Sequence, residues 1–160
     1  MRRANGEPIR DLRDYLELLD GRGDLLTVAE EIDPLDEMGA FIARADATGM
    51  NKAILFQKSK GSDMPVLANT VGSTYKRIAE SFGVSEGNAV AEAAMKMGKI
   101  MMGGTLPPVM VDPAKAPCKE VVLKGRKADL TILPIAMHHK DDCAPYLTMT
   151  CVIKGMNQDF

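Results

Sequence analysis

The sequence predicts a mixed α/β (α+β) domain over residues 1–112, followed by a β-rich segment over residues 113–160. In the first part, apolar residues at helical spacing alternate with short, continuously apolar runs, which is typical of helices interleaved with strands. In the second part, β-branched and apolar runs are punctuated by Pro and Gly, and none has a helical pattern. A short connector with two prolines, residues 112–117, separates the two parts.

The first predicted helix follows Pro8 and ends near Gly21, because Pro suits a first helical turn and Gly suits a helix end. Its apolar face is formed by Ile9, Leu12, Leu16 and Leu19. The run Leu25–Ile32 predicts a strand, since Leu26, Val28 and Ile32 supply most of its apolar side chains.

The second predicted helix begins with Asp33 as N-cap and Pro34 as its first residue, and Gly49 is its expected stop. Its buried face is expected to hold Leu35, Met38, Ile42 and Ala45. Two short strands follow. Ala53–Phe56 is continuously apolar and predicts a strand covered on both faces, and Pro65–Ala68 is its expected neighbour.

Two more helices are predicted, with Ser73 and Ser85 as their caps and Gly103 at the end of the second. The inward residues are expected to be Ile78, Ala79 and Phe82 in the first helix, and Val90, Ala94, Met97 and Met101 in the second. The methionines of this region suit adaptable core filling better than a ligand site. They are Met95, Met97, Met101, Met102 and Met110.

Composition excludes several classes of function. A formal charge of −2 and an aromatic content of 4% without Trp give no reason to expect a nucleic-acid partner. No apolar run approaches a membrane span, and no signal-peptide pattern follows the first residues, so we expect a cytoplasmic protein. Cys118, Cys143 and Cys151 show no metal-site spacing and predict reduced thiols, the last two as core residues.

Strands are predicted at Val109–Val111, just before the connector, and at Cys118–Leu123 and Tyr146–Lys154 in the second part. Charged residues between positions 119 and 127 fit the solvated face of a hairpin. Both histidines of the chain, His138 and His139, stand in one polar block with Lys140, Asp141 and Asp142. A His and an Asp of this block could hold a metal ion, but turn hydrogen bonds and an ion pair with Lys140 are the favoured interpretation.

Five ordered blocks of this second part resemble the UbiD family of prenylated-flavin-dependent decarboxylases. The blocks are Cys118–Gly125, Asp129–Thr131, Leu133–Ile135, His138–Asp142 and Pro145–Thr148. Residues 9–13, 31–34 and 61–67 are similar to the N-terminal domain of that family. The resemblance implies that residues 113–160 are the first strands of a split β-barrel that binds the flavin, and that only the front third of such an enzyme is covered.

The resemblance also implies a cofactor, prenylated FMN with a divalent metal (Mn or Mg) and K, in the intact enzyme. Thr148 is the residue expected to face the flavin, although a strand Thr on a solvated face is an equal alternative. The family has a Gly two residues later, where this chain has Thr150, and Gly would let the ring approach more closely. The family's metal-binding Asn falls beyond Phe160, and Asn157 matches the turn instead, so we expect no catalytic or metal-binding residue in this chain.

We therefore expect the N-terminal part of a carboxy-lyase that removes CO₂ from an aromatic or α,β-unsaturated acid, and that is inactive by itself. The expected partners are the remainder of the enzyme or a second subunit, further copies of the intact enzyme, and a flavin prenyltransferase as cofactor supplier. The alternative is a non-catalytic flavin-binding or assembly module with the same fold. An unrelated α/β binding protein is a third possibility.

Overall fold

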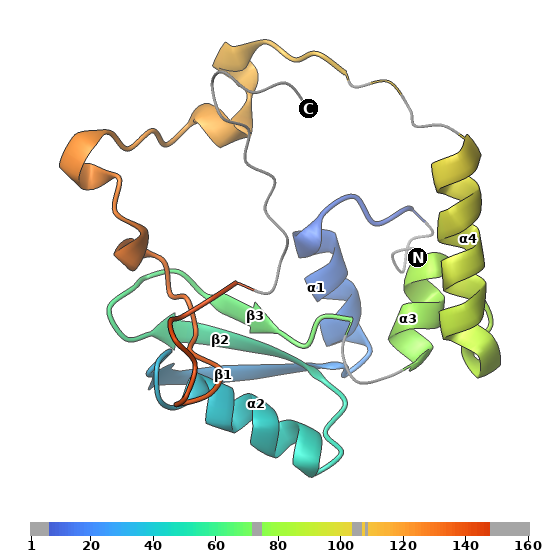
Figure 1. Cartoon of the computed structure of the whole chain (residues 1–160), viewed down its shortest axis with the longest axis horizontal. Helices are drawn as coiled ribbons and strands as arrows, with labels where there is room; N and C mark the ends of the chain where they lie inside the picture. The colour runs from blue at the N-terminus through green and yellow to red at the C-terminus, as the bar shows by residue number, and fades with distance from the viewer. Residues whose placement is uncertain (1–6, 72–74, 104–106, 108, 148–160) are drawn as a thin grey trace.

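The computed structural model describes residues 7–71, 75–103, 107 and 109–147 (Figure 1). Its helices are α1 (Leu12–Gly21), α2 (Met38–Ala47), α3 (Tyr75–Phe82) and α4 (Ala89–Gly103), and its strands are β1 (Leu25–Ile32), β2 (Ala53–Ser59) and β3 (Val66–Ala68). The predicted order of helices and strands over the first part is confirmed. None of the helices in these ranges is both long and apolar enough to cross a membrane.

The sheet has the order β1-β2-β3 and is mixed. Strands β1 and β2 pair in parallel and are connected through α2, whereas β3 pairs with β2 in the antiparallel sense. Between Val28 and Glu31, β1 holds one residue more than the matching stretch of β2, so the register shifts there. Strand β2 is central, which explains why Ala53, Ile54 and Phe56 are completely buried.

The main core lies where α2 packs on this sheet. Met38 and Ala45 of α2 join Ile54 and Phe56 of β2 in one buried cluster. The rings of Phe41 and Phe56 meet edge to face, with centroids 5.5 Å apart and planes 81° apart. Met38 and Ala45 are buried, which confirms their predicted inward positions, and Ile42 is half-buried. The prediction that Leu35 is buried is wrong, because its side chain is 48% exposed.

Helix α2 begins later than the sequence predicts. Asp33 does not cap it directly, because residues 34–37 form a turn and the first helical residue is Met38. Within the turn, the Asp33 carboxylate accepts from the backbone N–H of Leu35 at 2.9 Å, and the Asp33 carbonyl accepts from Glu37 and Met38 at 3.0 Å. The Asp-Pro pair therefore builds a hydrogen-bonded corner in front of the helix.

Helix α1 has a side-chain cap that the sequence analysis did not assign. The Asp11 carboxylate accepts from the backbone N–H groups of Arg13 and Asp14, at 2.9 and 3.1 Å. Leu19 is buried as predicted, but Leu12 is 54% exposed. The Tyr15 hydroxyl donates to the carbonyl of Thr70 at 2.7 Å, which ties α1 to the end of β3.

Helices α3 and α4 pack together, but α4 is rotated from its predicted orientation. Its buried residues are Ala89 and Ala93, whereas Val90 and Met97 are exposed. The five methionines are 47–91% exposed in the described structure, so their prediction as core filling is wrong. The small Ala89 and Ala93 form the buried face of α4, so the apolar pattern predicted the helix but not the face that is covered.

Ser85 also differs from its predicted role, because it precedes a short 3₁₀ turn, Glu86–Asn88, and its side chain does not cap α4. Its hydroxyl donates instead to the Glu92 carboxylate at 2.5 Å, and its backbone N–H to the same carboxylate at 2.9 Å. These hydrogen bonds lower the pKa of Glu92 below its ordinary value. The other predicted cap, Ser73, lies outside the described residues.

The described residues from 109 to 147 contain no strand. They form 3₁₀ turns at Pro113–Lys115, Pro117–Lys119, Gly125–Lys127 and Leu130–Ile132, joined by extended chain. The strands predicted at Val109–Val111 and Cys118–Leu123 are therefore absent. A strand needs a neighbour to accept its backbone hydrogen bonds, and Val121, at 75% exposure, has no such neighbour among the described residues.

Candidate functional site

The block singled out by the sequence lies in a segment that folds back onto the first domain. We call residues 132–146 the returning segment. Figure 1 shows the chain leading away from α4 in an open path before this segment reaches the sheet and α2 again. Ala136 is only 8% exposed and belongs to the same buried cluster as Met38 and Phe56.

Backbone hydrogen bonds hold the returning segment to the corner between β1 and α2. The N–H of Met137 donates to the carbonyl of Pro34 at 2.9 Å. Pro34 is itself buried, and Gly39 in the first turn of α2 is buried beneath the carbonyls of Met137 and His138. The returning segment is thus held by a backbone hydrogen bond and close main-chain packing, as well as by the buried side chain of Ala136.

The corner that receives the segment is held by an ion pair. Lys60 donates to the Asp33 carboxylate at 2.8 Å. The hydrogen bond from Lys60, followed by the one from the Leu35 N–H, lowers the pKa of Asp33, and the same contact raises the pKa of Lys60. Asp33 also donates its own N–H to the Glu37 carboxylate at 2.9 Å. Hydrogen bonds therefore engage both the backbone of the turn and the carboxylate of Asp33.

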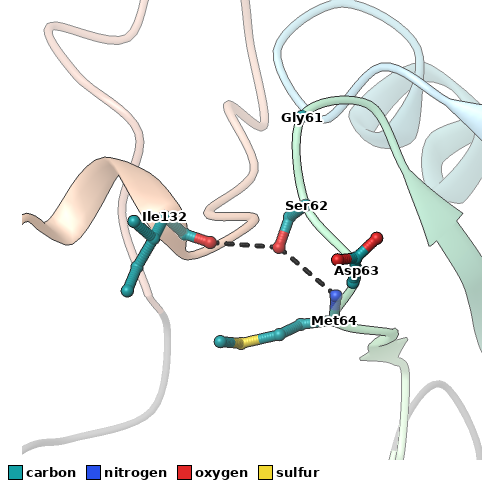
Figure 2. A pocket seen from close by; sticks show the side chains of 5 residues that line it. All are labelled: Gly61, Ser62, Asp63, Met64 and Ile132. Atoms are coloured by element: carbon teal, nitrogen blue, oxygen red, sulfur yellow. Dashed lines mark hydrogen bonds between the residues drawn. The ribbon is translucent and has the colours of Figure 1, made fainter.

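A second contact ties the start of the returning segment to the loop between β2 and β3. Ser62 donates its hydroxyl to the carbonyl of Ile132 at 3.0 Å and accepts from the N–H of Met64 at 3.3 Å (Figure 2). Gly61, Ser62, Asp63, Met64 and Ile132 line a shallow, open pocket there. Among these described lining residues, Asp63 supplies the acidic side chain and Ser62 the hydroxyl, and that hydroxyl is engaged with the backbone of Ile132 and Met64.

The returning segment is closed into a loop at its base. The N–H of Tyr146 donates to the carbonyl of Ala136 at 3.3 Å. The rings of His138 and Tyr146 lie against each other with centroids 4.8 Å apart and planes 41° apart. The two ends of the loop, ten residues apart in the sequence, are therefore held side by side.

The histidine block forms turn hydrogen bonds, as the favoured interpretation predicted. The N–H of His139 donates to the Asp142 carboxylate at 2.8 Å, and the N–H of Asp141 donates to Nδ1 of His139 at 3.3 Å. The expected ion pair of Lys140 is not seen within the described part of the chain. Instead, Nδ1 of His139 lies 3.5 Å from Oδ2 of Asp141.

The described residues do not form a metal site. No group of three His, Cys, Asp or Glu side chains in that part of the chain converges as metal ligands would. His138 faces Tyr146 while His139 bonds within its turn, so the two histidines do not share a site. A divalent metal beside the flavin would need donors from elsewhere, and we derive no chemical step through it from these residues.

The residue assigned to the flavin, Thr148, lies outside the described residues, as do Thr150, Cys151 and Asn157. Cys143 is described and exposed, so its prediction as a core thiol is wrong, and Cys118 is exposed as well. Sequence reasoning missed the seat formed by Pro34 and Gly39. Its only signal was a Gly inside an otherwise apolar helical pattern, which indicates a close approach without naming the partner.

Two family profiles match the chain. Residues 16–97 match the 3-octaprenyl-4-hydroxybenzoate carboxy-lyase N-terminal domain, and residues 109–159 match the Rift-related domain of the same carboxy-lyase. The first match ends within α4, and the second contains the whole returning segment.

Solved structures of the same class are similar. The UbiD-class enzyme HmfF from Pelotomaculum thermopropionicum, in complex with FMN, is 30% identical with a TM-score of 0.67, over 84% of this chain and 28% of that one. An evolved dimeric form of HmfF, in complex with prFMN, is also 30% identical, with a TM-score of 0.67 over 84% and 29%.

The vanillic acid decarboxylase of Sedimentibacter hydroxybenzoicus, in an open form with truncated VdcD, is 28% identical with a TM-score of 0.66, over 84% of this chain and 28% of that one. The chain thus spans a little over a quarter of the length of these relatives. With both profiles matched in order and these structures sharing the fold, the chain belongs to the UbiD family.

Proposed function

We propose that this chain is the N-terminal part of a UbiD-type decarboxylase. In the proposed reaction, the bond between a carboxylate and an unsaturated or aromatic carbon breaks, CO₂ leaves, and a proton takes its place, without net oxidation and reversibly. The observation that carries this proposal is the pair of matches, 16–97 and 109–159, to consecutive domains of one carboxy-lyase. The structure adds that both matched regions contribute to one buried cluster.

The proposed division of the chain is a mixed α/β domain over residues 1–112 and the start of a split β-barrel over residues 113–160. The gap between the two profile matches, residues 98–108, supports a division in this region.

The proposed cofactor is prenylated FMN, because HmfF relatives were solved with FMN and with prFMN. A divalent metal, Mn or Mg, and K would accompany it, and Thr148 would face the flavin. The chemistry would belong to the cofactor, while the protein positions the reacting groups and excludes water. We propose a cytoplasmic enzyme that receives its flavin from a prenyltransferase.

The proposed partners are the rest of the enzyme and further copies of the intact protein. The vanillic acid decarboxylase relative contains VdcD, and one HmfF relative is dimeric, so assembly is common to the proteins that this chain is similar to. By itself the chain is proposed to be inactive.

Two preparations test the proposal. One is the isolated chain, and the other is the chain completed by the polypeptide that supplies the remaining UbiD domains, both produced together with a flavin prenyltransferase. The completed protein is expected to retain prenylated FMN and to exchange labelled CO₂ into an aromatic or unsaturated acid. The isolated chain is expected to do neither.

The same preparations address the alternative of a non-catalytic flavin-binding or assembly module. Tight flavin binding by the isolated chain would favour that alternative, because binding would then need no further domain. A completed protein that binds flavin but exchanges no CO₂ with a panel of such acids would also contradict the decarboxylase proposal.

A further inference from the structure

We propose that Gly39 is a positioning residue for the returning segment, an inference that rests on the proposed function. Gly39 lies in the first turn of α2, about 100 residues before that segment in the sequence. Its role would be to let the main chain of Met137 and His138 lie directly against the helix. The first domain would then set the position of a segment that belongs to the Rift-related match.

The space around Gly39 is the first part of the argument. A Cβ atom built on Gly39 would lie 2.7 Å from the carbonyl oxygen of His138 and 2.9 Å from that of Met137, with the carbonyl carbon of His138 at 3.1 Å. All three are backbone atoms, so no side-chain rotation can relieve the contact. Any larger residue at this position requires the returning segment or the helix to move.

The second part is that neighbouring contacts also fix the position of the returning segment beside Gly39. Met137 donates its N–H to the Pro34 carbonyl at 2.9 Å, and Ala136 is buried in the core beside it. A shift of a few tenths of an ångström at Gly39 would therefore strain a hydrogen bond and a packed methyl group together. The seat accepts one position of the segment.

The third part connects the seat to the other end of the returning segment. The Tyr146 N–H bonds to the Ala136 carbonyl, and the Tyr146 ring packs on the His138 ring. Tyr146 is thereby fixed relative to Gly39. An error at the seat is thus passed on to the base of the loop.

The test compares Gly39→Ala with Gly98→Ala, a matched change in the described part of α4. A Cβ on Gly98 meets nothing within 4 Å, and both glycines are helical, so helix propensity favours Ala at each position. In the wild-type protein and in each variant, hydrogen exchange is followed at Met137 and Tyr146, which report on the seat and the loop base, and at Phe56 in β2.

Gly39→Ala is expected to raise exchange at Met137 and Tyr146 at least about tenfold while leaving Phe56 unchanged, and Gly98→Ala is expected to change none of the three. Unchanged exchange in Gly39→Ala, or an equal rise at all three positions, would overturn the proposal. Ala136→Asp provides a second variant that unseats the segment from its own side, and raised exchange at Met137 and Tyr146 is expected from it.

The functional arm uses the completed enzyme. Gly39→Ala is expected to lower the amount of bound prenylated FMN, or to shift its visible absorption spectrum, at an unchanged thermal midpoint. A raised exchange rate with normal flavin content and spectrum would show that Gly39 seats the segment without positioning the cofactor, and would overturn the proposal. Absence of flavin from the wild-type enzyme would instead contradict the proposed function, and the exchange experiment would remain decisive for the seat.

Discussion

Asp33 combines three tasks in one short side chain. It accepts from the Leu35 N–H, pairs with Lys60, and begins the turn whose next residue, Pro34, receives the returning segment. Asp-Pro was recognised in the sequence as a helix start, but the ion pair with Lys60 could not be predicted. Lys60 lies 27 residues away, and only the pairing of β1 with β2 brings the two together.

The lowered pKa of Asp33 predicts a pH dependence of stability. A carboxyl whose folded pKa lies below its unfolded value stabilises the fold above that value, here 3.8, and this contribution is lost as the pH falls through the folded pKa. Asp33→Asn should therefore weaken the dependence of the urea midpoint on pH below about 4. Asp63→Asn is the control, because Asp63 forms no ion pair with the described residues, and an equal effect of both changes would contradict the assignment.

Phe56 is the largest fully buried side chain of the described core, and Phe41 packs on its edge. Phe56→Ala should lower the free energy of unfolding by about 3–5 kcal/mol, because it removes apolar contact and leaves a cavity. Phe41→Leu should cost less, with about 0.5–1.5 kcal/mol from the lost ring pair. Urea denaturation measures both. Met95→Ala, at a side chain that is 59% exposed, should stay within about 0.5 kcal/mol of wild type.

At the scale of single elements, α1 tests how far capping stabilises a short helix. Asp11→Ala should lower the free energy of unfolding by about 1 kcal/mol, because two backbone N–H groups lose their acceptor. Asp11→Asn should retain most of the stability, since its amide oxygen can accept the same bonds. Equal losses in the two variants, measured by urea denaturation, would show that charge and not capping is responsible.

The elements of the first domain were predictable where local pattern and packing agree. The run Ala53–Phe56 is apolar on both faces, and β2 is indeed the central strand. Helix α4 shows the opposite case, since its pattern is apolar around Val90 and Met97 while Ala89 and Ala93 are buried. A hydrophobic pattern indicates that a face will be covered, but it does not specify by which surface.

The strands predicted at Val109–Val111 and Cys118–Leu123 failed for a similar reason. Val121 and Val122 have high strand propensity, yet they are exposed and unpaired within the described structure. Strand formation is a property of two segments, and propensity describes only one. The candidate site follows the same rule: the histidine turn was local and was predicted, whereas the seat at Pro34 and Gly39 depends on a contact across about 100 residues.

At the scale of the whole molecule, the open path and the seated loop predict different protease sensitivity. Lys119 and Lys127 end exposed 3₁₀ turns and Lys124 precedes one, whereas Lys140 lies in a loop held at both ends. Limited trypsin treatment should cut at the first three sites about tenfold faster than at Lys140, since cleavage there requires local opening. Mass spectrometry of early fragments gives the order. Cleavage at Lys140 as early as at Lys124 would contradict a seated loop.

The long sequence separation between Pro34 and Met137 has a consequence for synthesis on the ribosome. At a rate of roughly 5–20 residues per second, the corner beside α2 leaves the ribosome several seconds before the residues that will cover it. During that interval, Met38 and Phe56 can already contact Ile32, Ala45 and Ile54 of their buried cluster, and Ala136 is still to be added. The nascent first domain can therefore fold early and offer a finished template, on which the later part of the polypeptide is laid down as it emerges.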